Sequence, residues 1–420
     1  MKIAIIGAGF TGLSAGFKLS KAGHEVTIFE KDSSPGGLAS GFKDPKWQWA
    51  LDKYYRHCFT NDNAILSLAK ELNHPIITKR PETAVYVNDK FYKLDSPIDV
   101  LKFPELSLIE RFRMGITIAL LKYNPYWKPL EKYKVSVWLP KMMGEKPYEL
   151  LWKPLIIKKF GPYFEDISLA WFWARIVKRT PSLAYPEGGF LEFANSIASE
   201  ILKKGGKVLL SSEVKEIKIQ KNKKIKINNL AFDKVIATTS ASTFVKMTPR
   251  LPDDYKQKLL DLKMLSAVIL ILRLKKTFFQ NRTYWLNICD TKSPLTGIVE
   301  HTNFIDKKYY NNEHLVYLLN YFHPNHPFLQ KDKNELLKIY DPFLRRINSQ
   351  YETGIIDFRL FSDKFAQPII PTNYSKIIPP LKTPLPNVYL ANMQQVYPWD
   401  RGTNYAVELG EKVADVIIDS

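Results

Sequence analysis

The chain has 420 residues, 45% of them hydrophobic, so it is long enough to bury the cores of two or three domains. Its two cysteines exclude a disulfide framework and fit a reducing compartment, and no apolar run approaches the length of a transmembrane helix. The net charge of +19 favours anionic partners such as a phosphorylated substrate or an acidic lipid surface, and we find no nucleic-acid motif.

The first 39 residues organise the chain. Lys2–Ile6 is a short apolar run typical of a buried strand, and Gly7-x-Gly9-x-x-Gly12 follows it directly. A periodic segment from Thr11 to about Ala22 predicts a helix, and Glu25–Phe29 predicts a second strand. This order of strand, glycine turn, helix and strand is typical of a dinucleotide-binding βαβ unit.

Each glycine of this turn has a physical role. Gly7 permits a tight turn, Gly9 lets the backbone approach a pyrophosphate, and Gly12 lets the helix pack closely against the strand. The helix N-terminus offers free N–H groups to the phosphates. Glu30 stands 18 positions after Gly12, where it can accept hydrogen bonds from ribose hydroxyls and repel a 2′-phosphate.

A second glycine motif extends this site. Lys31 is followed by Pro35-Gly36-Gly37-Leu38-Ala39, a basic residue and a Gly-Gly pair. The combined pattern resembles the fingerprint of the FAD-dependent amine oxidase, protoporphyrinogen oxidase and phytoene desaturase superfamily. The resemblance implies that FAD, rather than NAD, is the cofactor, with Gly36, Gly37 and Leu38 near its diphosphate and ribityl chain.

Aromatic and basic residues follow the Gly-Gly pair. The stretch WQWALDKYYRH at 47–57 contains Tyr54, Arg56 and His57, which are candidates for lining a substrate pocket; a packed surface loop is the alternative. Asp62–Leu72 has helical spacing, and Ala84–Leu94 reads as a hairpin that turns at Asn88-Asp89.

From Pro97 to Arg179 the pattern is mainly helical and rich in aromatic residues, which indicates a helical insertion. Its mixture of Trp, Tyr, Pro and Lys suits either a capped helical subdomain or a membrane interface. Lys159-Phe160-Gly161 and the segment from Ala170 to Arg175 resemble a stretch common in desaturase-like relatives of protoporphyrinogen oxidase.

The middle of the chain returns to the cofactor domain. Leu191–Lys203 predicts a helix, 207–211 starts a strand that 213–217 continues, and Asp233–Thr238 predicts the next strand. The resemblance implies that Val214 contacts adenine through its backbone. Alternating apolar stretches within 262–361 predict an antiparallel sheet, and we predict no metal site there because His323 and His326 have no accompanying carboxylates or thiols.

The C-terminal segment resembles the final FAD motif of the superfamily. Residues 387–391 predict a strand and Thr403–Ile418 a helix, and the loop between them holds the pocket candidates Trp399, Asp400 and Arg401. The resemblance implies that Asn392, Asn404, Tyr405 and Ala406 contact the cofactor, with the helix N-terminus near the flavin. The superfamily usually has Gly and an acid where this chain has Ala391 and Asn392, and no cysteine is present for covalent attachment.

The predicted fold is α/β: a Rossmann-like FAD-binding domain interlaced with an α+β substrate domain made of an antiparallel sheet and a helical insertion. We assign 1–84, 186–250 and 386–420 to the FAD-binding domain, 85–185 to the helical insertion and 251–385 to the sheet.

The resemblance implies an FAD-dependent oxidoreductase that transfers hydride from an organic substrate to flavin N5, with FAD bound non-covalently and no identified catalytic base. A UDP-galactopyranose mutase-like isomerase acting on a nucleotide- or lipid-linked sugar is the alternative, although that family usually has Asn where this chain has Leu38; a non-catalytic FAD-binding scaffold is a third. We expect a small-molecule substrate, anionic or lipid-linked, and a cytoplasmic location, with peripheral contact at the cytoplasmic face of the membrane left open.

Overall fold

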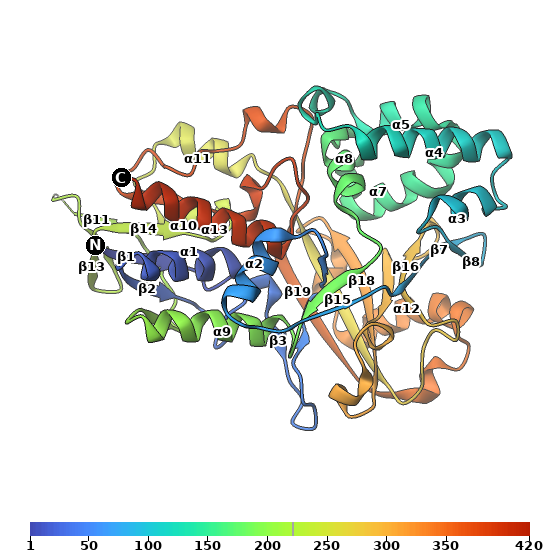
Figure 1. The fold of residues 1–420 in the computed structure, drawn as a ribbon, viewed down its shortest axis with the longest axis horizontal. Coiled ribbons are helices and arrows are strands. Elements are labelled where there is room, and N and C mark those ends of the chain that lie inside the picture. The colour runs from blue at the N-terminus through green and yellow to red at the C-terminus, as the bar shows by residue number, and fades with distance from the viewer. Residues whose placement is uncertain (221) are drawn as a thin grey trace.

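Two β-sheets lie side by side along the long axis of the protein in the computed structural model, which describes residues 1–220 and 222–420 (Figure 1). The first is a five-stranded parallel sheet in the order β10-β2-β1-β14-β20. Its strands in chain order are β1 (Lys2–Ile6), β2 (Glu25–Phe29), β10 (Lys207–Leu209), β14 (Lys234–Ala237) and β20 (Val388–Leu390). The sheet therefore draws strands from widely separated parts of the chain, while the exact division into five segments stays a prediction.

The predicted βαβ unit is confirmed. Strands β1 and β2 pair in parallel over their whole length, and α1 (Phe10–Lys21) connects them. The strand predicted from Lys207 ends at Leu209, and the prediction that 213–217 continues it is wrong. The reason is local: Ser211 adopts a φ of 50°, and the amides of Ser211 and Ser212 donate to the carbonyl oxygens of Asp32 and Glu30 rather than to a sheet partner.

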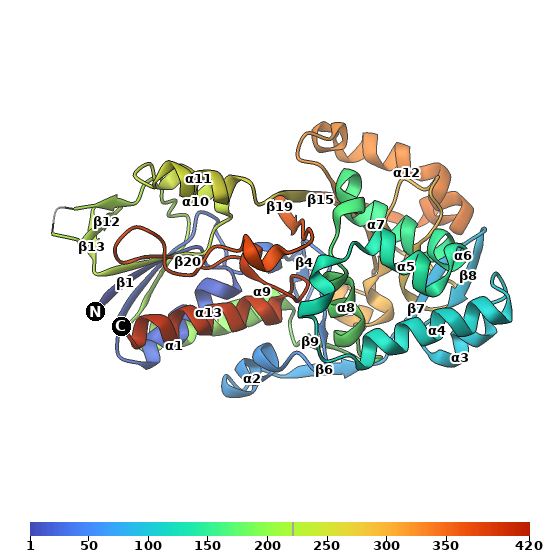
Figure 2. The same ribbon diagram turned by 90° about the horizontal axis from the view of Figure 1, so that it is seen from above.

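Helices cover both faces of the parallel sheet (Figure 2). One face carries α1, α9 (Phe190–Lys203) and α13 (Thr403–Ile418), and the other carries α10 (Ala241–Met247) and α11 (Asp253–Leu260). Helices α1 and α13 touch closely, because the Ser14 hydroxyl donates to the Val407 carbonyl at 3.1 Å and Gly410 has no side chain to separate them. The predicted helices at 191–203 and 403–418 are confirmed.

The second sheet has seven strands in the order β19-β15-β18-β17-β16-β7-β8. In chain order they are β7 (Glu82–Val87), β8 (Lys90–Lys93), β15 (Met264–Leu274), β16 (Thr283–Ile288), β17 (Gly297–Glu300), β18 (His314–Phe322) and β19 (Ile355–Pro368). All neighbours are antiparallel except β16 and β7, which pair in parallel. The predicted antiparallel sheet is thus confirmed with one parallel addition, since the hairpin β7–β8 extends its edge.

The β7–β8 hairpin could be predicted from the residues of its turn. Asn88 and Asp89 both adopt positive φ, at 48° and 62°, as the two-residue turn between right-twisted strands requires. One helix in this region was missed, α12 (Lys333–Ile347), which lies where the sequence was interpreted as strands and loops. A capping box at Asp332 and Glu335 starts it, and Leu336, Tyr340, Phe343 and Leu344 form its buried face.

The predicted helical insertion packs beside the second sheet, at the upper right of Figure 1. It comprises α3 (Pro97–Lys102), α4 (Leu108–Tyr123), α5 (Val135–Met143), α6 (Glu145–Pro147), α7 (Lys153–Phe160) and α8 (Leu169–Lys178). A capping box at Ser107 and Glu110 starts α4. Lys122 caps the end of α8 by donating to two of its last carbonyls and to that of Arg179, which follows the helix. Within the described residues, no helix combines the length and the apolar character needed to cross a bilayer.

Three small sheets and one helix complete the fold. Helix α2 (Asn63–Glu71) confirms the predicted helix at 62–72. The small sheets consist of β3 (Gly41–Phe42) with β4 (Leu51–Asp52); β5 (Cys58–Phe59) with β9 (Leu183–Pro186) and β6 (Ile76–Lys79); and β11 (Lys218–Ile219) with β12 (Ile225–Ile227) and β13 (Leu230–Phe232).

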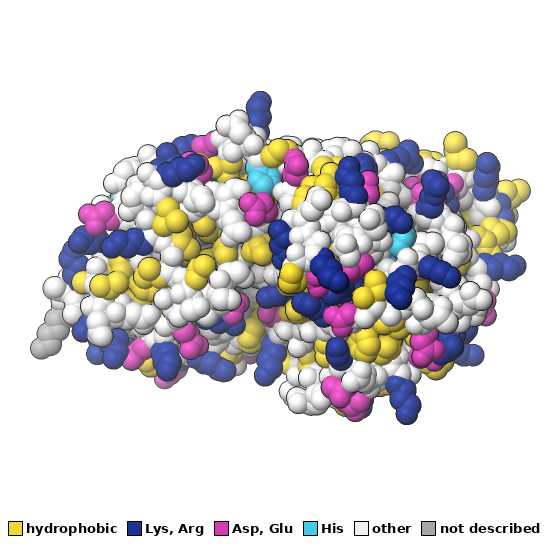
Figure 3. All heavy atoms as spheres, turned by 90° about the horizontal axis from the view of Figure 1, so that it is seen from below, with side chains coloured by type: hydrophobic (Ala, Val, Ile, Leu, Met, Phe, Trp, Pro, Cys, Tyr) yellow, Lys and Arg dark blue, Asp and Glu magenta, His cyan; other side chains and the backbone are white. Residues whose placement is uncertain are grey.

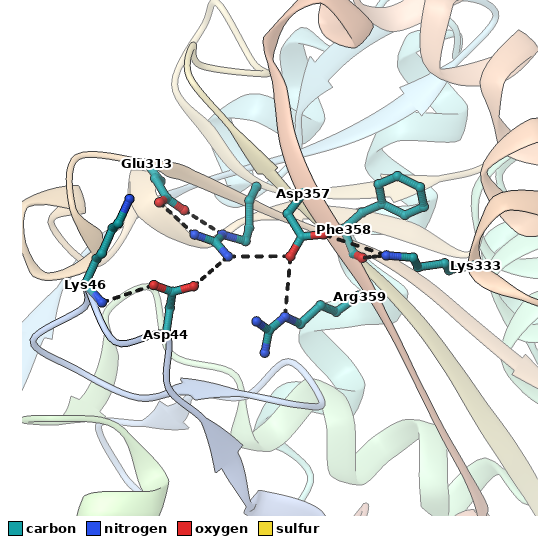
Figure 4. A network of polar contacts seen from close by, with 8 residues as sticks. Asp44, Lys46, Glu313, Lys333, Asp357, Phe358 and Arg359 are labelled. Carbon is teal, nitrogen blue, oxygen red and sulfur yellow. Dashed lines mark hydrogen bonds and ion pairs between the residues drawn. The ribbon is translucent and has the colours of Figure 1, made fainter.

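A buried arginine joins the loop after β3 to the second sheet. Figure 4 shows the carboxylates of Asp44, Glu313 and Asp357 converging on one guanidinium. This group belongs to Arg273 on β15, which donates to both oxygens of Glu313 at 2.7 and 2.8 Å and to Asp44 at 2.8 Å. Arg273 and Glu313 are almost fully buried, so the attraction between their opposite charges is needed to offset the free-energy cost of removing each charge from water.

We expect Arg273→Met to lower the free energy of unfolding by about 3–5 kcal/mol, because it leaves the buried Glu313 carboxylate without its partner. Urea denaturation followed by circular dichroism measures the change. The control is Arg345→Met, which removes an exposed pair with Asp341 and is expected to cost less than about 1 kcal/mol. Equal effects of the two substitutions would contradict this account.

Candidate cofactor and substrate site

Gly7 and Gly12 leave no room for a side chain in the first glycine turn. Gly7 has a φ of 106°, and a Cβ there would lie 2.5 Å from the Thr238 hydroxyl. A Cβ on Gly12 would lie only 2.0 Å from the Gly7 carbonyl oxygen. The start of α1 is therefore pressed directly against the end of β1, as the spacing of the glycines predicts.

The second glycine loop packs on the first, backbone against backbone. The Gly36 amide donates to the Ala8 carbonyl at 2.8 Å, and Gly9 and Gly36 form a parallel β-bridge. A Cβ on Gly37 would lie 3.2 Å from the Gly9 Cα, and both Gly36 and Gly37 adopt positive φ. The two loops thus meet through glycine backbone, next to the uncapped first turn of α1, and this arrangement fits a pyrophosphate.

Glu30 lies at the end of β2, beside these two loops. Its Oε2 accepts from the Ala8 amide at 2.7 Å and its Oε1 from the Asp32 amide at 2.9 Å. Each oxygen keeps a further lone pair for a ribose hydroxyl, so the carboxylate can shape the loop and also accept from a nucleotide. Lys31 is exposed, and Val214 is buried in the same apolar cluster as Phe29.

The C-terminal loop brings the other predicted cofactor residues to the first sheet. Asn392 follows β20, where its side chain caps the short helix Met393–Gln395 and donates to the Thr239 carbonyl at 2.9 Å. Asn404 accepts from the Ile65 amide at 3.1 Å and so joins α13 to α2. Both side chains are thus held by protein backbone, and their contact with a cofactor stays a prediction, as it does for Ala406.

Two helices begin at this edge of the sheet with uncapped amides. Helix α1 starts after Gly9 and α13 after Gly402, and neither has a side-chain cap or an acidic residue in its first turn. Because α1 and α13 pack side by side, their positive ends lie at the same edge of the sheet. This arrangement fits a ligand that carries a diphosphate at one end and an electron-accepting ring at the other.

The loop before α13 presents an aromatic wall. The Trp399 ring stacks on Trp173 of α8 on one side, with centroids 5.5 Å apart, and on Tyr405 on the other, at 5.8 Å. The Lys178 ammonium lies 4.7 Å from the Trp399 ring. Residues of α8 and α13 that are more than 200 positions apart in the chain therefore enclose the predicted pocket residue.

Asp400 is the acidic centre of a cluster of cations. Its Oδ2 accepts from Arg175 at 2.6 Å and from Lys159 at 3.2 Å. Although burial alone raises the pKa of a carboxyl, the positive charges of Lys159, Arg175 and Arg401 hold the pKa of Asp400 well below its usual range. The carboxylate is therefore charged throughout the physiological range.

Arg401 turns to the second sheet and does not pair with the Asp400 side chain. Its guanidinium donates to the Gln367 Oε1 at 2.9 Å and to the Tyr321 hydroxyl at 2.6 Å, while only its backbone amide donates to Asp400. Gln367 lies on β19 and Tyr321 on β18. The side chains of Asp400 and Arg401 thus form no ion pair with each other among the described contacts.

Arg56 links the second glycine loop to this cluster. Its Nε and Nη2 both donate to the Leu38 carbonyl, at 3.0 and 2.7 Å. Burial, reinforced by the charge of Arg401, lowers the pKa of Arg56 to about 10. The two stretches singled out in the sequence, 54–57 and 399–401, are therefore brought together in the fold.

The opposite wall is aromatic and uncharged. The Tyr55 hydroxyl is hydrogen-bonded to His57 Nδ1 and to the Tyr284 hydroxyl. Burial, with Arg179 and Arg175 adding to it, lowers the pKa of His57 to about 3, and burial raises the pKa of Tyr55 well above its usual value. These groups are neutral near pH 7. Tyr54 is half-buried beside them, and burial raises its pKa as well.

Several residues of the site were not predicted from the sequence. Lys159 and Arg175 stand in stretches that indicated only a resemblance to desaturase-like proteins, and Arg179 ends the predicted helical region. Burial lowers the pKa of Lys159 to about 7, although Asp400 acts in the opposite direction. Gln367 and Tyr321 gave no signal beyond alternation in a strand, because their partners are distant in the chain.

A buried carboxyl next to the pocket was also missed. Asp52 Oδ2 accepts from the Tyr185 hydroxyl at 2.7 Å, while Oδ1 has no partner among the described residues. Burial raises the pKa of Asp52 to about 7, against the smaller effects of Tyr185 and Arg56.

The model of the family described as flavin containing amine oxidoreductase matches residues 10–418. The chain belongs to this family of flavoprotein oxidoreductases. FAD is its cofactor, bound non-covalently, and the two glycine loops are where its pyrophosphate fits.

Solved structures of the same fold cover almost the whole chain. A putative protoporphyrinogen oxidase from Exiguobacterium sp. 255-15 superposes with a TM-score of 0.75 at 12% identity, over 99% of this chain and 98% of the other. A putrescine oxidase variant gives 0.77 at 15% identity, over 100% and 99%. Reduced UDP-galactopyranose mutase gives 0.75 at 16% identity, over 100% and 95%.

Curated relatives match in part. The chain is 23% identical to 15-cis-phytoene desaturase from Synechococcus elongatus over 255 residues, which cover 55% of this chain and 54% of the desaturase. It is 56% identical to a 4,4'-diapophytoene desaturase from Staphylococcus aureus over 43 residues, which cover 10% of this chain and 9% of that protein. The chain thus spans at most about half the length of these two desaturases.

We expect Gly12→Ala to weaken FAD binding by about tenfold or more, because the new methyl group would overlap the Gly7 carbonyl oxygen. The ratio of flavin to protein absorbance after purification, and titration of the stripped protein with FAD, measure the loss. Gly115→Ala on α4, where nothing lies within 4 Å of the added carbon, is the control and should keep full occupancy. Unchanged FAD affinity in Gly12→Ala would contradict the proposed packing.

Because Asp52 is buried, we expect the free energy of unfolding to depend on pH. The pKa of Asp52 is about 7 in the folded protein and near 3.8 in the unfolded chain. Between these two pH values the folded protein holds a proton on Asp52 that the unfolded chain has lost, so the free energy of unfolding decreases as the pH rises through this range. Asp52→Asn should remove this component, so that the free energy of unfolding of the wild type relative to the variant falls by several kcal/mol from acid to neutral pH. The exposed Asp254→Asn is the control for urea denaturation across this range; a pH-independent difference for Asp52→Asn would refute the assignment.

Proposed function

We propose that this protein is an FAD-dependent oxidoreductase that oxidises an organic substrate carrying an anionic group. Bound FAD supplies the two-electron chemistry, accepting a hydride at its N5. The observation that carries the proposal is that two groups of residues lie at one edge of the parallel sheet: the two glycine loops with the N-termini of α1 and α13, and the cluster of cations and aromatic rings around Asp400 and Trp399.

The charges of the pocket suggest the substrate class. Four cations act on the Asp400 carboxylate: Lys159, Arg175, Arg179 and Arg401. Arg56 lies near Arg401, so cations outnumber carboxylates in this cluster of described residues. Arg179 has no carboxylate within ion-pair distance in the described parts of the chain, although it keeps an exposed surface. It is therefore the cation best placed to bind an anionic group of the substrate.

The neutral wall would hold the rest of the substrate. His57, Tyr55 and Tyr284 are uncharged near pH 7 and lie beside the ring of Trp285, so they offer an apolar surface with hydroxyl groups. Trp399 and Tyr405 close the pocket on the side of α13. Because the charged cluster lies beside this uncharged group, the two together would orient an amphipathic substrate in one direction, which supports productive alignment.

The second candidate function is a mutase-like isomerisation of a nucleotide- or lipid-linked sugar. The same cluster of cations favours it, since a diphosphate would be bound well there, and the likeness to UDP-galactopyranose mutase includes the whole fold. Leu38 in place of the usual Asn speaks against it.

The first experiment is an absorbance spectrum of the purified protein, with mass identification of the released cofactor. Anaerobic mixing of the FAD-loaded protein with putrescine, phytoene, protoporphyrinogen and UDP-galactopyranose then separates the candidates. Bleaching of the flavin by one of the first three supports oxidation, and the positive site predicts that protonated putrescine is poor. If the pre-reduced protein converts the sugar and none of the other three compounds bleaches the flavin, the isomerase is favoured. A colourless protein that does not take up FAD would overturn both the oxidoreductase and the isomerase proposals.

Arg179→Gln should weaken the binding of inorganic pyrophosphate to the FAD-loaded protein by about tenfold or more, because it removes a charged donor of the pocket. The perturbation of flavin absorbance during titration measures the affinity, and added salt should weaken the wild type more than the variant. Arg250→Gln, on the cofactor domain away from the pocket, serves as the control. Equal affinity in wild type and Arg179→Gln would remove Arg179 from the anion site.

A further inference from the structure

Helix α4 is apolar on two opposite faces. Its inner face packs in the core through Met114, Thr117 and Leu121. Its outer face carries large apolar side chains that are 55 to 84% exposed: Leu108, Ile109, Phe112, Ile116, Leu120 and Tyr123. A helix at the surface of a soluble protein normally presents polar residues to water, so this outer face calls for a covering partner.

Neighbouring elements extend this apolar surface. Exposed apolar side chains continue on α3, beyond the end of α4 and on α5, and the outer face of α4 with these residues is called the α4 patch: Ile98, Leu101, Tyr126, Tyr133, Val137 and Met142. A hollow of about 470 Å³ opens at the C-terminal end of α4, lined by Ile116, Ala119, Leu120, Tyr123 and Asn124. The patch is therefore broad and contains a depression large enough for an acyl chain segment.

Cations border the α4 patch. Lys102, Arg113, Lys132 and Lys141 are exposed on α3, α4, the following loop and α5. None of these four has a carboxylate within ion-pair distance among the described residues. Figure 3 shows hydrophobic and dark-blue side chains interspersed at the right-hand end of the protein, the end that carries α3 and α4 in Figure 1.

We propose that the α4 patch docks on the surface of an anionic lipid bilayer, with α4 lying in the plane of the interface. Exposed Leu, Ile and Phe side chains would enter the acyl boundary, tyrosines would lie at headgroup level, and the bordering lysines would pair with lipid phosphates. The protein would attach peripherally, in keeping with its lack of a helix able to span a bilayer in the described residues.

Charge favours the bilayer over a second copy of this chain. A two-fold dimer would place the same patch on both subunits, so the bordering lysines and arginine of one copy would face those of the other. Such like-charge contact is unfavourable, whereas an anionic surface neutralises every one of these cations. The chain's net charge of +19 acts in the same direction.

The patch lies one helix away from the candidate site. On the inner side of α4, Lys122 donates to the carbonyls of Ile176, Val177 and Arg179 at the end of α8. Next to it, the Asn124 carbonyl accepts from Trp173, the residue that stacks on Trp399. A bilayer bound to the patch would thus be adjacent to the pocket that the proposed function requires.

Flotation of the FAD-loaded protein with lipid vesicles tests this proposal. We expect the protein to float with phosphatidylcholine vesicles that contain phosphatidylglycerol, and at least about a hundredfold less with vesicles of phosphatidylcholine alone, because these offer no partner to any of the four bordering cations. The double variant Ile116→Gln, Leu120→Gln should lose at least tenfold in bound fraction, since two apolar side chains no longer enter the lipid. Lys132→Gln should lose about fivefold, because it removes one bordering charge.

The control variant is Leu202→Gln on α9, whose leucine is 53% exposed, close to the 55% of Leu120, but lies on the cofactor domain. Flavin content and the far-ultraviolet spectrum verify that every variant is folded. The proposal is overturned if the wild type does not bind the anionic vesicles, or if the double variant binds as well as wild type. If the wild type binds no vesicles, gel filtration shows it to be a dimer and the double variant is a monomer, the α4 patch would instead be the contact with a second copy of the chain.

Discussion

The contact between the two glycine loops is the constraint on which the cofactor site depends. Ala8 joins them, because its carbonyl accepts from Gly36 and its amide donates to Glu30. The first loop is thus held by a strand end on one side and by the second loop on the other. A side chain at Gly37 would press on the Gly9 backbone, so the closest approach of the two loops is one of backbone against backbone.

The pocket beside the cofactor site has an uneven distribution of charge. Lys159, Arg175 and Arg401 come from α7, α8 and the loop before α13, while Arg56 and the neutral aromatic groups come from the 54–57 loop and β16. Since α7 and α8 belong to the helical insertion and Gln367 and Tyr321 to the second sheet, three separate parts of the fold must be in place before Asp400 and Arg401 are fixed. The site is a product of tertiary packing.

A feature could be predicted from the sequence when its residues lie within one short segment, and not when tertiary packing brings them together. The βαβ unit, Glu30 and the Asn88-Asp89 turn were readable because each depends on residues within one short segment. The partners of Asp400 and Arg401 were not, because Lys159, Arg175 and Gln367 are far away in the chain and no local pattern marks them. Helix α12 was missed although its capping box and the spacing of Leu336, Tyr340 and Leu344 were visible, because strands on both sides dominated the pattern.

The packing of α13 on α1 also determines when the protein can acquire its cofactor. Helix α1 is synthesised among the first elements, and α13 only after every other element of the site. While the chain is still on the ribosome, the surface of α1 that receives Gly410 is uncovered and the ring end of the cofactor site has no helix N-terminus. The complete cofactor site therefore exists only after α13 has been synthesised and has packed on α1.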